Sequence, residues 1–189
     1  MICRAIFDSF VVLKFRLVLV TLLLLASVPK VQAQEQSIHA LRSAYLYYFS
    51  HFISWPEKTE FTNNELKLCV LTDDEKDRYQ LSTIENKNLG VNTLHIQFFE
   101  AVGNAAADDL SQCHMMYVAE RYDRWLENNT DRIDDKTLLV TEGGLQAKGD
   151  IHLFKLKKKL KFEINHEELM SRQFKVSSKL LRLSRREGA

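Results

Sequence analysis

The stretch Leu66-Lys67-Leu68-Cys69-Val70-Leu71 is the strongest indication of the fold, because it is a short apolar run that leads directly into Thr72-Asp73-Asp74. An apolar run of about four to eight residues that ends in polar turn residues is typical of a buried strand. The polar stretch from Glu75 to about Asn86 then indicates a helix. A strand followed by a helix is the repeating unit of α/β proteins.

The same unit recurs further along the chain. The sequence predicts strands at Thr93–Phe99, Cys113–Ala119 and Thr137–Thr141, a helix or irregular crossover at Phe99–Gln112, and a helix at Arg121–Asn128. Parallel strands need crossover connections of about a dozen residues, which these segments supply. The predicted fold class is therefore α/β: a single domain with a mainly parallel sheet flanked by helices, as in Rossmann or flavodoxin-like folds.

The pattern changes after Gly143-Gly144. Ile151–Leu156 and Leu160–Ile164 alternate apolar and polar residues, which predicts a C-terminal antiparallel hairpin at the edge of the sheet. A final helix is predicted to start at Ser177 or Ser178, because serine is a favourable N-cap.

An aromatic helix is predicted from Ser37 to Ser54, ending at Trp55-Pro56 because proline cannot continue a helix. Its apolar residues recur every three or four positions and predict a core-facing stripe of Ile38, Leu41, Tyr45, Tyr48 and Phe52. Three further aromatic residues then fall away from this stripe and are candidates for partner binding: Tyr47, Phe49 and Trp55. The alternative is burial of these side chains under loops.

The first residues have the pattern of a secretory signal peptide. Basic residues precede the apolar run Leu17–Val28, and Val31-Gln32-Ala33 offers a cleavage site. We therefore expect residues 1–33 to be a signal peptide and residues 34–189 to be a periplasmic domain without an integral membrane segment. The alternative, a membrane anchor, is disfavoured because the run is shorter than the roughly 20 residues that span a bilayer.

Charge and cysteine content narrow the functional classes. The 26 basic and 25 acidic residues of the chain fall to 22 and 24 without residues 1–33, a balance that disfavours nucleic-acid binding. Cys69 and Cys113 are then the remaining cysteines, and an even pair in an oxidising compartment predicts a disulfide. In the strand order 2-1-3-4-5 their strands, the first and third, are neighbours.

Three segments together resemble the YfiR-like family of periplasmic proteins: Ala44-Tyr45-Leu46-Tyr47-Tyr48-Phe49-Ser50-His51-Phe52-Ile53-Ser54-Trp55-Pro56, Lys67-Leu68-Cys69-Val70-Leu71, and Leu160-Lys161-Phe162-Glu163-Ile164-Asn165 followed by Val176-Ser177-Ser178-Lys179-Leu180-Leu181. The resemblance implies a regulatory binding protein that represses an inner-membrane diguanylate cyclase by docking on its periplasmic sensor domain. Loss of the repressor would raise cyclic-di-GMP synthesis and biofilm formation.

The resemblance also implies a homodimer and a control linked to disulfides. Cys69 and Cys113 match one of the family's cysteine pairs, whereas the second pair has no counterpart, so the bridge is either structural or redox-sensing. Phe154 and Glu163 of the predicted hairpin are further candidates for partner binding. The reason is that the segment Phe162-Glu163-Ile164-Asn165 is part of the resemblance.

Other motifs leave alternatives open. The run Lys155–Lys161 holds five lysines and is either a solvated hairpin or a docking site for an acidic partner or lipid headgroups. Thr141-Glu142-Gly143-Gly144 is either a plain turn or part of a small-molecule site, as in a periplasmic ligand-binding protein that serves a transporter or sensor.

The sequence contains no motif for catalysis, metal binding or a cofactor. The histidines lack metal-binding spacing, and neither a GxSxG nor a CxxC motif is present. We expect neither an enzyme nor a cofactor. A thiol oxidoreductase is the catalytic alternative, and it would require a reactive Cys69 or Cys113.

Overall fold

The computed structural model describes residues 30–100, 110–143, 149–157 and 159–184. The chain divides into two compact units, residues 1–35 and Gln36–Ala189, and the second unit contains all of the strands within the described residues. Most of the predicted signal peptide, residues 1–33, lies outside the described residues. Among the described helices, none combines the length and the hydrophobicity that a bilayer span requires.

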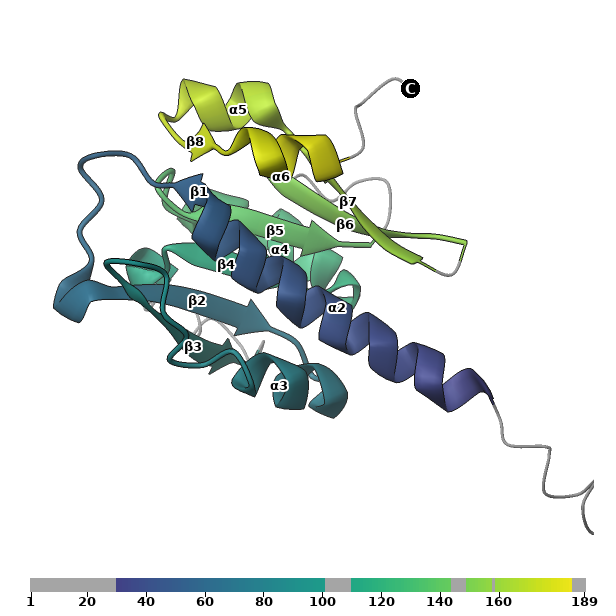
Figure 1. The fold of residues 1–189 in the computed structure, drawn as a ribbon. Helices are drawn as coiled ribbons and strands as arrows, with labels where there is room; N and C mark the ends of the chain where they lie inside the picture. Colours follow the sequence, from purple (N-terminus) through teal and green to yellow (C-terminus); the bar gives the residue numbers. More distant parts are fainter. Residues whose placement is uncertain (1–29, 101–109, 144–148, 158, 185–189) are drawn as a thin grey trace, which may run out of the picture. The chain divides into compact units, whose positions relative to one another are not determined.

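A six-stranded sheet forms the centre of the fold (Figure 1). Its strands lie in the order β3-β2-β4-β5-β6-β7, with bounds Thr93–Phe99, Glu65–Leu71, Met115–Val118, Leu138–Glu142, Ile151–Leu156 and Lys159–Ile164. All neighbours are parallel except β6 and β7, which form an antiparallel hairpin at the edge. The predicted α/β class, the neighbouring cysteine strands and the edge hairpin are confirmed.

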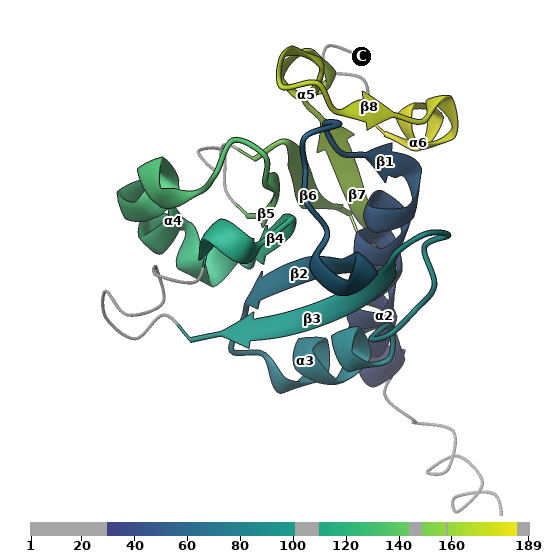
Figure 2. The ribbon, with the colours of Figure 1, turned by 90° about the vertical axis from the view of Figure 1, so that its left-hand side faces the viewer.

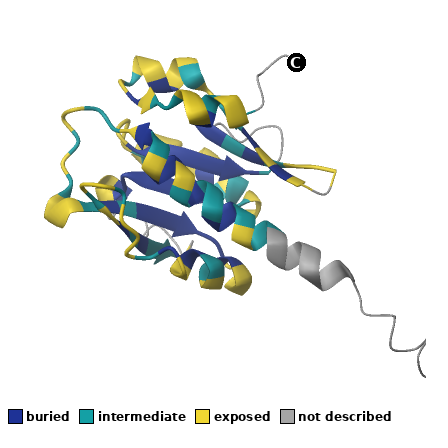
Figure 3. Ribbon diagram, in the orientation of Figure 1, coloured by how far each residue is buried: buried dark blue, intermediate teal, exposed yellow. Residues whose placement is uncertain are grey.

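Helices cover both faces of this sheet (Figure 2). On one face, α2 (Lys30–Phe52) and α3 (Glu75–Ser82) pack over the larger apolar core, which also receives residues from α5 (His166–Ser171) and α6 (Ser178–Leu183). On the other face, α4 (Asp123–Asn129) packs over a smaller core. The central strands β2, β4 and β5 are buried on both sides (Figure 3), as their near-continuous apolar composition requires, whereas the hairpin tip of β6 and β7 is exposed.

Local signals set the ends of the helices. Asp74 caps α3 by accepting hydrogen bonds from the backbone N–H groups of Lys76 and Asp77. Ser177 caps α6 in the same way, as predicted. Single 3-10 turns occur at 62–64, 110–112, 120–122 and 130–132.

A second, two-stranded sheet was not predicted. After α2 the chain continues as β1 (Ile53–Ser54), which pairs in antiparallel fashion with β8 (Lys175–Val176). Strands of two residues are too short for any periodicity to show in the sequence. Their pairing joins the end of α2 to the C-terminal part of the domain.

Candidate functional site

Leu41, Tyr45 and Phe52 of the predicted stripe of α2 pack against the core, but the fully buried face of the helix lies beside that stripe. Phe49 is fully buried and packs edge-on against Phe162, whereas Tyr48 is 43% exposed. The prediction that Phe49 falls away from the core is therefore wrong. The buried face runs through Leu46, Phe49 and Ile53, and it is continued by a charged residue, Arg42. Because this buried face includes a charged residue, the apolar periodicity of the sequence does not reveal it.

Trp55 and Tyr47 are partly buried and bonded to other elements. The Trp55 indole N–H donates to the His114 carbonyl at 2.8 Å, and its ring packs against Phe174. The Tyr47 hydroxyl donates to the Asn88 carbonyl at 3.3 Å. Both rings keep some exposed surface, so both stay candidates for partner binding.

A cavity of about 570 Å³ lies beside Trp55. Its walls come from the β1 region and from α5 to β8, so the pairing of β1 with β8 creates it. Met170, which is 59% exposed, contributes an apolar side chain, and Glu57 and Lys175 contribute opposite charges. The remaining lining residues are Trp55, His166, Gln173, Phe174 and Val176.

The last two predicted partner residues lie elsewhere, on the hairpin at the sheet edge. Phe154 pairs with Lys161 and Glu163 with His152 across the β6–β7 ladder, so all four share one face. That face is opposite to the buried one, which carries Leu153 and Phe162. The five predicted residues are thus spread over the domain: Phe49 lies in the core, Trp55 at the cavity, Phe154 and Glu163 on the hairpin, and Tyr47 beside Asn88.

A buried ionic cluster is the feature that the sequence interpretation missed. The Arg42 guanidinium donates two hydrogen bonds to Glu142, at 2.5 and 2.7 Å, and a third to Asp77. The Tyr117 hydroxyl donates to Glu142 at 2.8 Å, and the His39 ring lies 2.5 Å from an Asp77 carboxylate oxygen. The cluster therefore joins α2, α3, β4 and β5 at the carboxyl end of the sheet.

The ion pairs of Arg42 with Glu142 and Asp77 make the cluster an ionic network, and the pKa directions of Arg42, Glu142 and Tyr117 follow from it. Burial alone would raise the pKa of Glu142, but the hydrogen bonds and charge of Arg42 outweigh it and hold this pKa below its usual value. Burial likewise opposes the charge of Arg42, yet its bond to Glu142 raises the Arg42 pKa. Burial raises the pKa of the Tyr117 phenol well above its usual value. Glu142 is thus a carboxylate and Tyr117 a hydrogen-bond donor.

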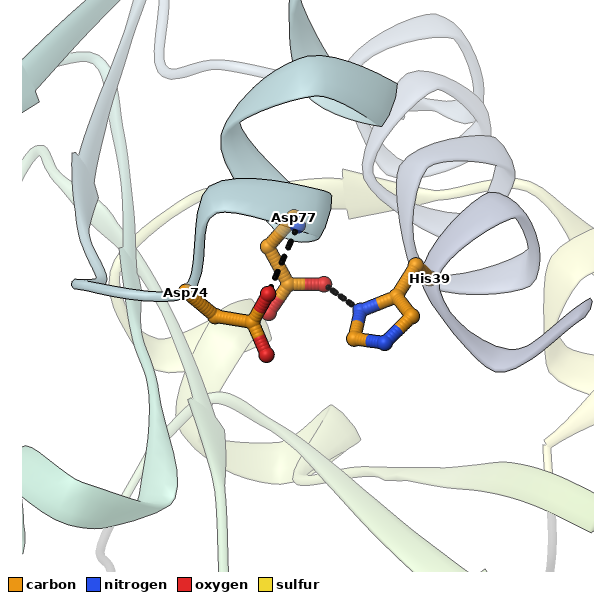
Figure 4. Close-up of side chains that lie close together, drawn as sticks. All are labelled: His39, Asp74 and Asp77. Carbon is orange, nitrogen blue, oxygen red and sulfur yellow. Dashed lines mark hydrogen bonds and ion pairs between the residues drawn. The ribbon is translucent and has the colours of Figure 1, made fainter. Parts of the chain in front are cut away.

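His39, Asp74 and Asp77 are the described side chains whose arrangement could hold a metal ion (Figure 4). One ligand atom from each lies within 4.8 Å of the others. However, Asp77 already accepts from Arg42 and contacts His39, and Asp74 accepts backbone N–H groups as the cap of α3. These contacts explain why the three side chains lie together: they connect α2 to α3 and cap α3.

The turn after β5 is explained by close packing. Gly143 has φ +131°, and a Cβ there would lie 2.5 Å from the Glu120 side chain, so glycine is required. Gly144, the other glycine of the predicted small-molecule site, lies outside the described residues. Glu142 itself points inward to Arg42 and is not available to a ligand.

The disulfide joins Cys69 of β2 to Cys113, just before β4, with a Cα–Cα distance of 5.7 Å. Both cysteines are buried in the smaller core beneath α4. We expect iodoacetamide to label neither residue in native protein without reductant, whereas a thiol oxidoreductase would need an accessible thiolate.

The next residue, His114, connects three segments by hydrogen bonds. Its Nδ1 accepts from the Lys67 backbone N–H at 2.9 Å, which leaves Nε2–H to donate to the Glu60 carbonyl at 2.8 Å. Its ring stacks on Phe61 with centroids 4.6 Å apart. Burial lowers the pKa of His114 and outweighs the opposing bond to Glu60. A protonated ring could not accept from Lys67.

We therefore predict that His114 makes the protein less stable in mild acid. Because its pKa is lower in the folded than in the unfolded chain, the unfolded chain binds the additional proton. The contribution of neutral His114 to the free energy of unfolding is fully present above pH of about 6.5. It is lost as the pH falls toward the pKa of the folded state, by about 1.4 kcal/mol per pH unit. Urea unfolding between pH of about 7.5 and 5.5 measures it. His114→Gln, which can accept and donate but does not titrate, is expected to flatten this slope, and an unchanged slope would refute the prediction.

Comparison with known proteins identifies the family of this chain. No curated protein matches the sequence. A family model described as YfiR/HmsC-like matches residues 39–185, which is most of the chain and includes α2 from His39 onward, the six-stranded sheet, and α5 and α6. This family is regulatory and is not a known class of enzyme. The chain therefore belongs to the YfiR/HmsC-like family, whose members are in general periplasmic regulators of diguanylate cyclase signalling.

Proposed function

We propose that this protein is a periplasmic repressor that binds the periplasmic domain of an inner-membrane diguanylate cyclase and lowers cyclic-di-GMP synthesis and biofilm formation. The observation that carries the proposal is the family match over residues 39–185. The disulfide between Cys69 and Cys113 supports an oxidising compartment. Removal of residues 1–33 as a signal peptide is part of the proposal.

Repression follows from differential binding. A protein that binds the inactive state of a cyclase more tightly than the active state shifts the population toward the inactive state, by no more than that difference in affinity. Such binding needs a preformed surface. We consider two surfaces of this kind: the cavity rim around Trp55 and Met170, and the hairpin face with Phe154 and Glu163.

We place the main contact at the cavity rim. Interfaces favour aromatic residues and methionine around a pocket, and Trp55 and Met170 provide them above the buried Phe174. Glu57 and Lys175 add opposite charges to the same wall and would orient a partner. The hairpin face would extend the contact through Glu163.

The test is recovery of a diguanylate cyclase from detergent-solubilised membranes by the purified protein. Met170→Asp and Glu163→Lys are expected to weaken recovery about tenfold or more, as loss of a central contact does. Val91→Asp is the matched control, since Val91 is 85% exposed and lies on a turn far along the chain from both surfaces. Circular dichroism of each variant shows that it is folded.

Failure of the wild type to recover a cyclase would overturn the repressor proposal. If wild type, both variants and the control recover the cyclase equally, the repressor proposal stands, but the cyclase contact does not include Met170 or Glu163. Sedimentation analysis of the same preparations tests the homodimer, which we propose from the family resemblance alone.

A further inference from the structure

The tip of the β6–β7 hairpin extends beyond the rest of the sheet. Within the described residues, β5 pairs with β6 only along Ile151–Leu153, whereas β6 and β7 remain paired from Ile151 to Leu156. Residues 154–157 and 159–161 therefore form a two-stranded arm that projects past β5 (Figure 1). We call this segment the lysine arm, because its described lysines are all exposed: Lys155, Lys157, Lys159 and Lys161.

The outer face of the lysine arm combines charge with apolar surface. Leu156 pairs with Lys159 and Phe154 with Lys161, so two apolar side chains and two lysines share this face. Leu156 is 45% exposed and Phe154 is partly exposed. Leu160, which points to the opposite face, is buried. The arm is thus anchored by one leucine and presents another to solvent.

The positive charge of the arm contrasts with the remainder of the domain. Residues 34–189 hold 22 basic and 24 acidic residues, and five of the basic ones lie between Lys155 and Lys161. The remainder of the domain therefore carries a net charge of −7. An anionic surface would repel that remainder and attract the arm, so it would orient the molecule with the arm toward it.

Two classes of anionic surface could fit, an acidic protein or a membrane. Protein interfaces are depleted in lysine and favour arginine, which makes rigid bidentate contacts. Lysines that surround a leucine and a phenylalanine instead match the membrane interface, where ammonium groups reach lipid phosphates and apolar side chains enter the headgroup layer. The composition and shape of the arm favour the membrane.

We propose that the lysine arm is a membrane-binding element that holds the domain on a phospholipid surface rich in anionic headgroups. Lys159 and Lys161 on the outer face, together with Lys157 at the tip, would contact phosphates, while Leu156 would enter the interface with Phe154 behind it. The inference does not require the cyclase, although the arm shares Phe154 with the hairpin face of the proposed cyclase contact. Met170, at the proposed main docking surface, lies outside it.

The experiment is co-sedimentation of the purified protein, expressed from the full-length chain, with vesicles of equal parts phosphatidylglycerol and phosphatidylcholine. Binding is expected at low salt, to weaken as salt is added, and to be lost with vesicles of phosphatidylcholine alone. Each lysine near an anionic surface contributes about fivefold, so Lys157→Gln with Lys159→Gln is expected to weaken binding about 25-fold. Leu156→Ser is expected to remove the fraction that resists salt.

The matched control removes two other exposed lysines, Lys87 and Lys179, by the same change to glutamine. It alters the net charge equally but is expected to leave vesicle binding within about twofold of wild type. Absence of wild-type binding to the anionic vesicles, or an equal loss in the control, would overturn the proposal. An arm variant that binds vesicles like wild type but no longer recovers the cyclase would identify the arm as a protein contact instead.

Discussion

Replacement of Arg42 by methionine is expected to lower the free energy of unfolding by about 3–5 kcal/mol. The side chains of Arg42, Asp77 and Glu142 are each 6% exposed, so removal of the cation leaves two carboxylates in the interior without their main partner. The penalty is the desolvation of those carboxylates and exceeds the net stability of the ion pair itself. Urea unfolding at neutral pH measures the effect.

Two further variants separate charge from packing in this cluster. Arg42→Lys keeps a cation but cannot form the paired hydrogen bonds to Glu142, so its loss should be intermediate. Adding Glu142→Leu to Arg42→Met should restore part of the stability, because it removes one of the unpaired buried charges. A loss below about 1 kcal/mol for Arg42→Met would show that water replaces the guanidinium, contrary to the buried geometry.

Reduction of the disulfide is expected to destabilise the fold by about 4 kcal/mol, which corresponds to a fall of about 10 °C in the unfolding temperature. The bridge links residues 44 positions apart, so it restricts the unfolded chain strongly. It also ties the central strand β2 to the start of β4 beneath α4. Thermal unfolding with and without reductant compares the two states in one sequence.

A Cys69→Ala, Cys113→Ala variant provides the control for this prediction. It should unfold at or below the temperature of the reduced protein, since it lacks the bridge and also loses buried sulfur atoms from the smaller core. Its unfolding temperature should not respond to reductant. Equal unfolding temperatures for the oxidised and fully reduced wild type would show that the bridge does not stabilise the native fold.

The central architecture could be predicted from local patterns in the sequence. Apolar runs such as Leu66–Leu71 are buried on both sides in a parallel sheet, so their strand character is visible without knowledge of neighbours. Their order along the chain, with helical crossovers, indicated which strands adjoin and therefore that Cys69 and Cys113 could meet. The hairpin and the Ser177 cap also follow from local patterns.

The buried face of α2 and the meeting of the site residues depend instead on tertiary contacts. Aromatic residues occur around most of this helix, so hydrophobicity could not distinguish its faces, and the buried face includes the charged Arg42. Arg42 is acceptable there because Asp77 and Glu142, which lie 35 and 100 positions away, are brought to it by folding. The pairing of β1 with β8, which forms the Trp55 cavity, likewise joins distant short segments. Contacts of this kind depend on chain positions far apart, and no local pattern specifies them.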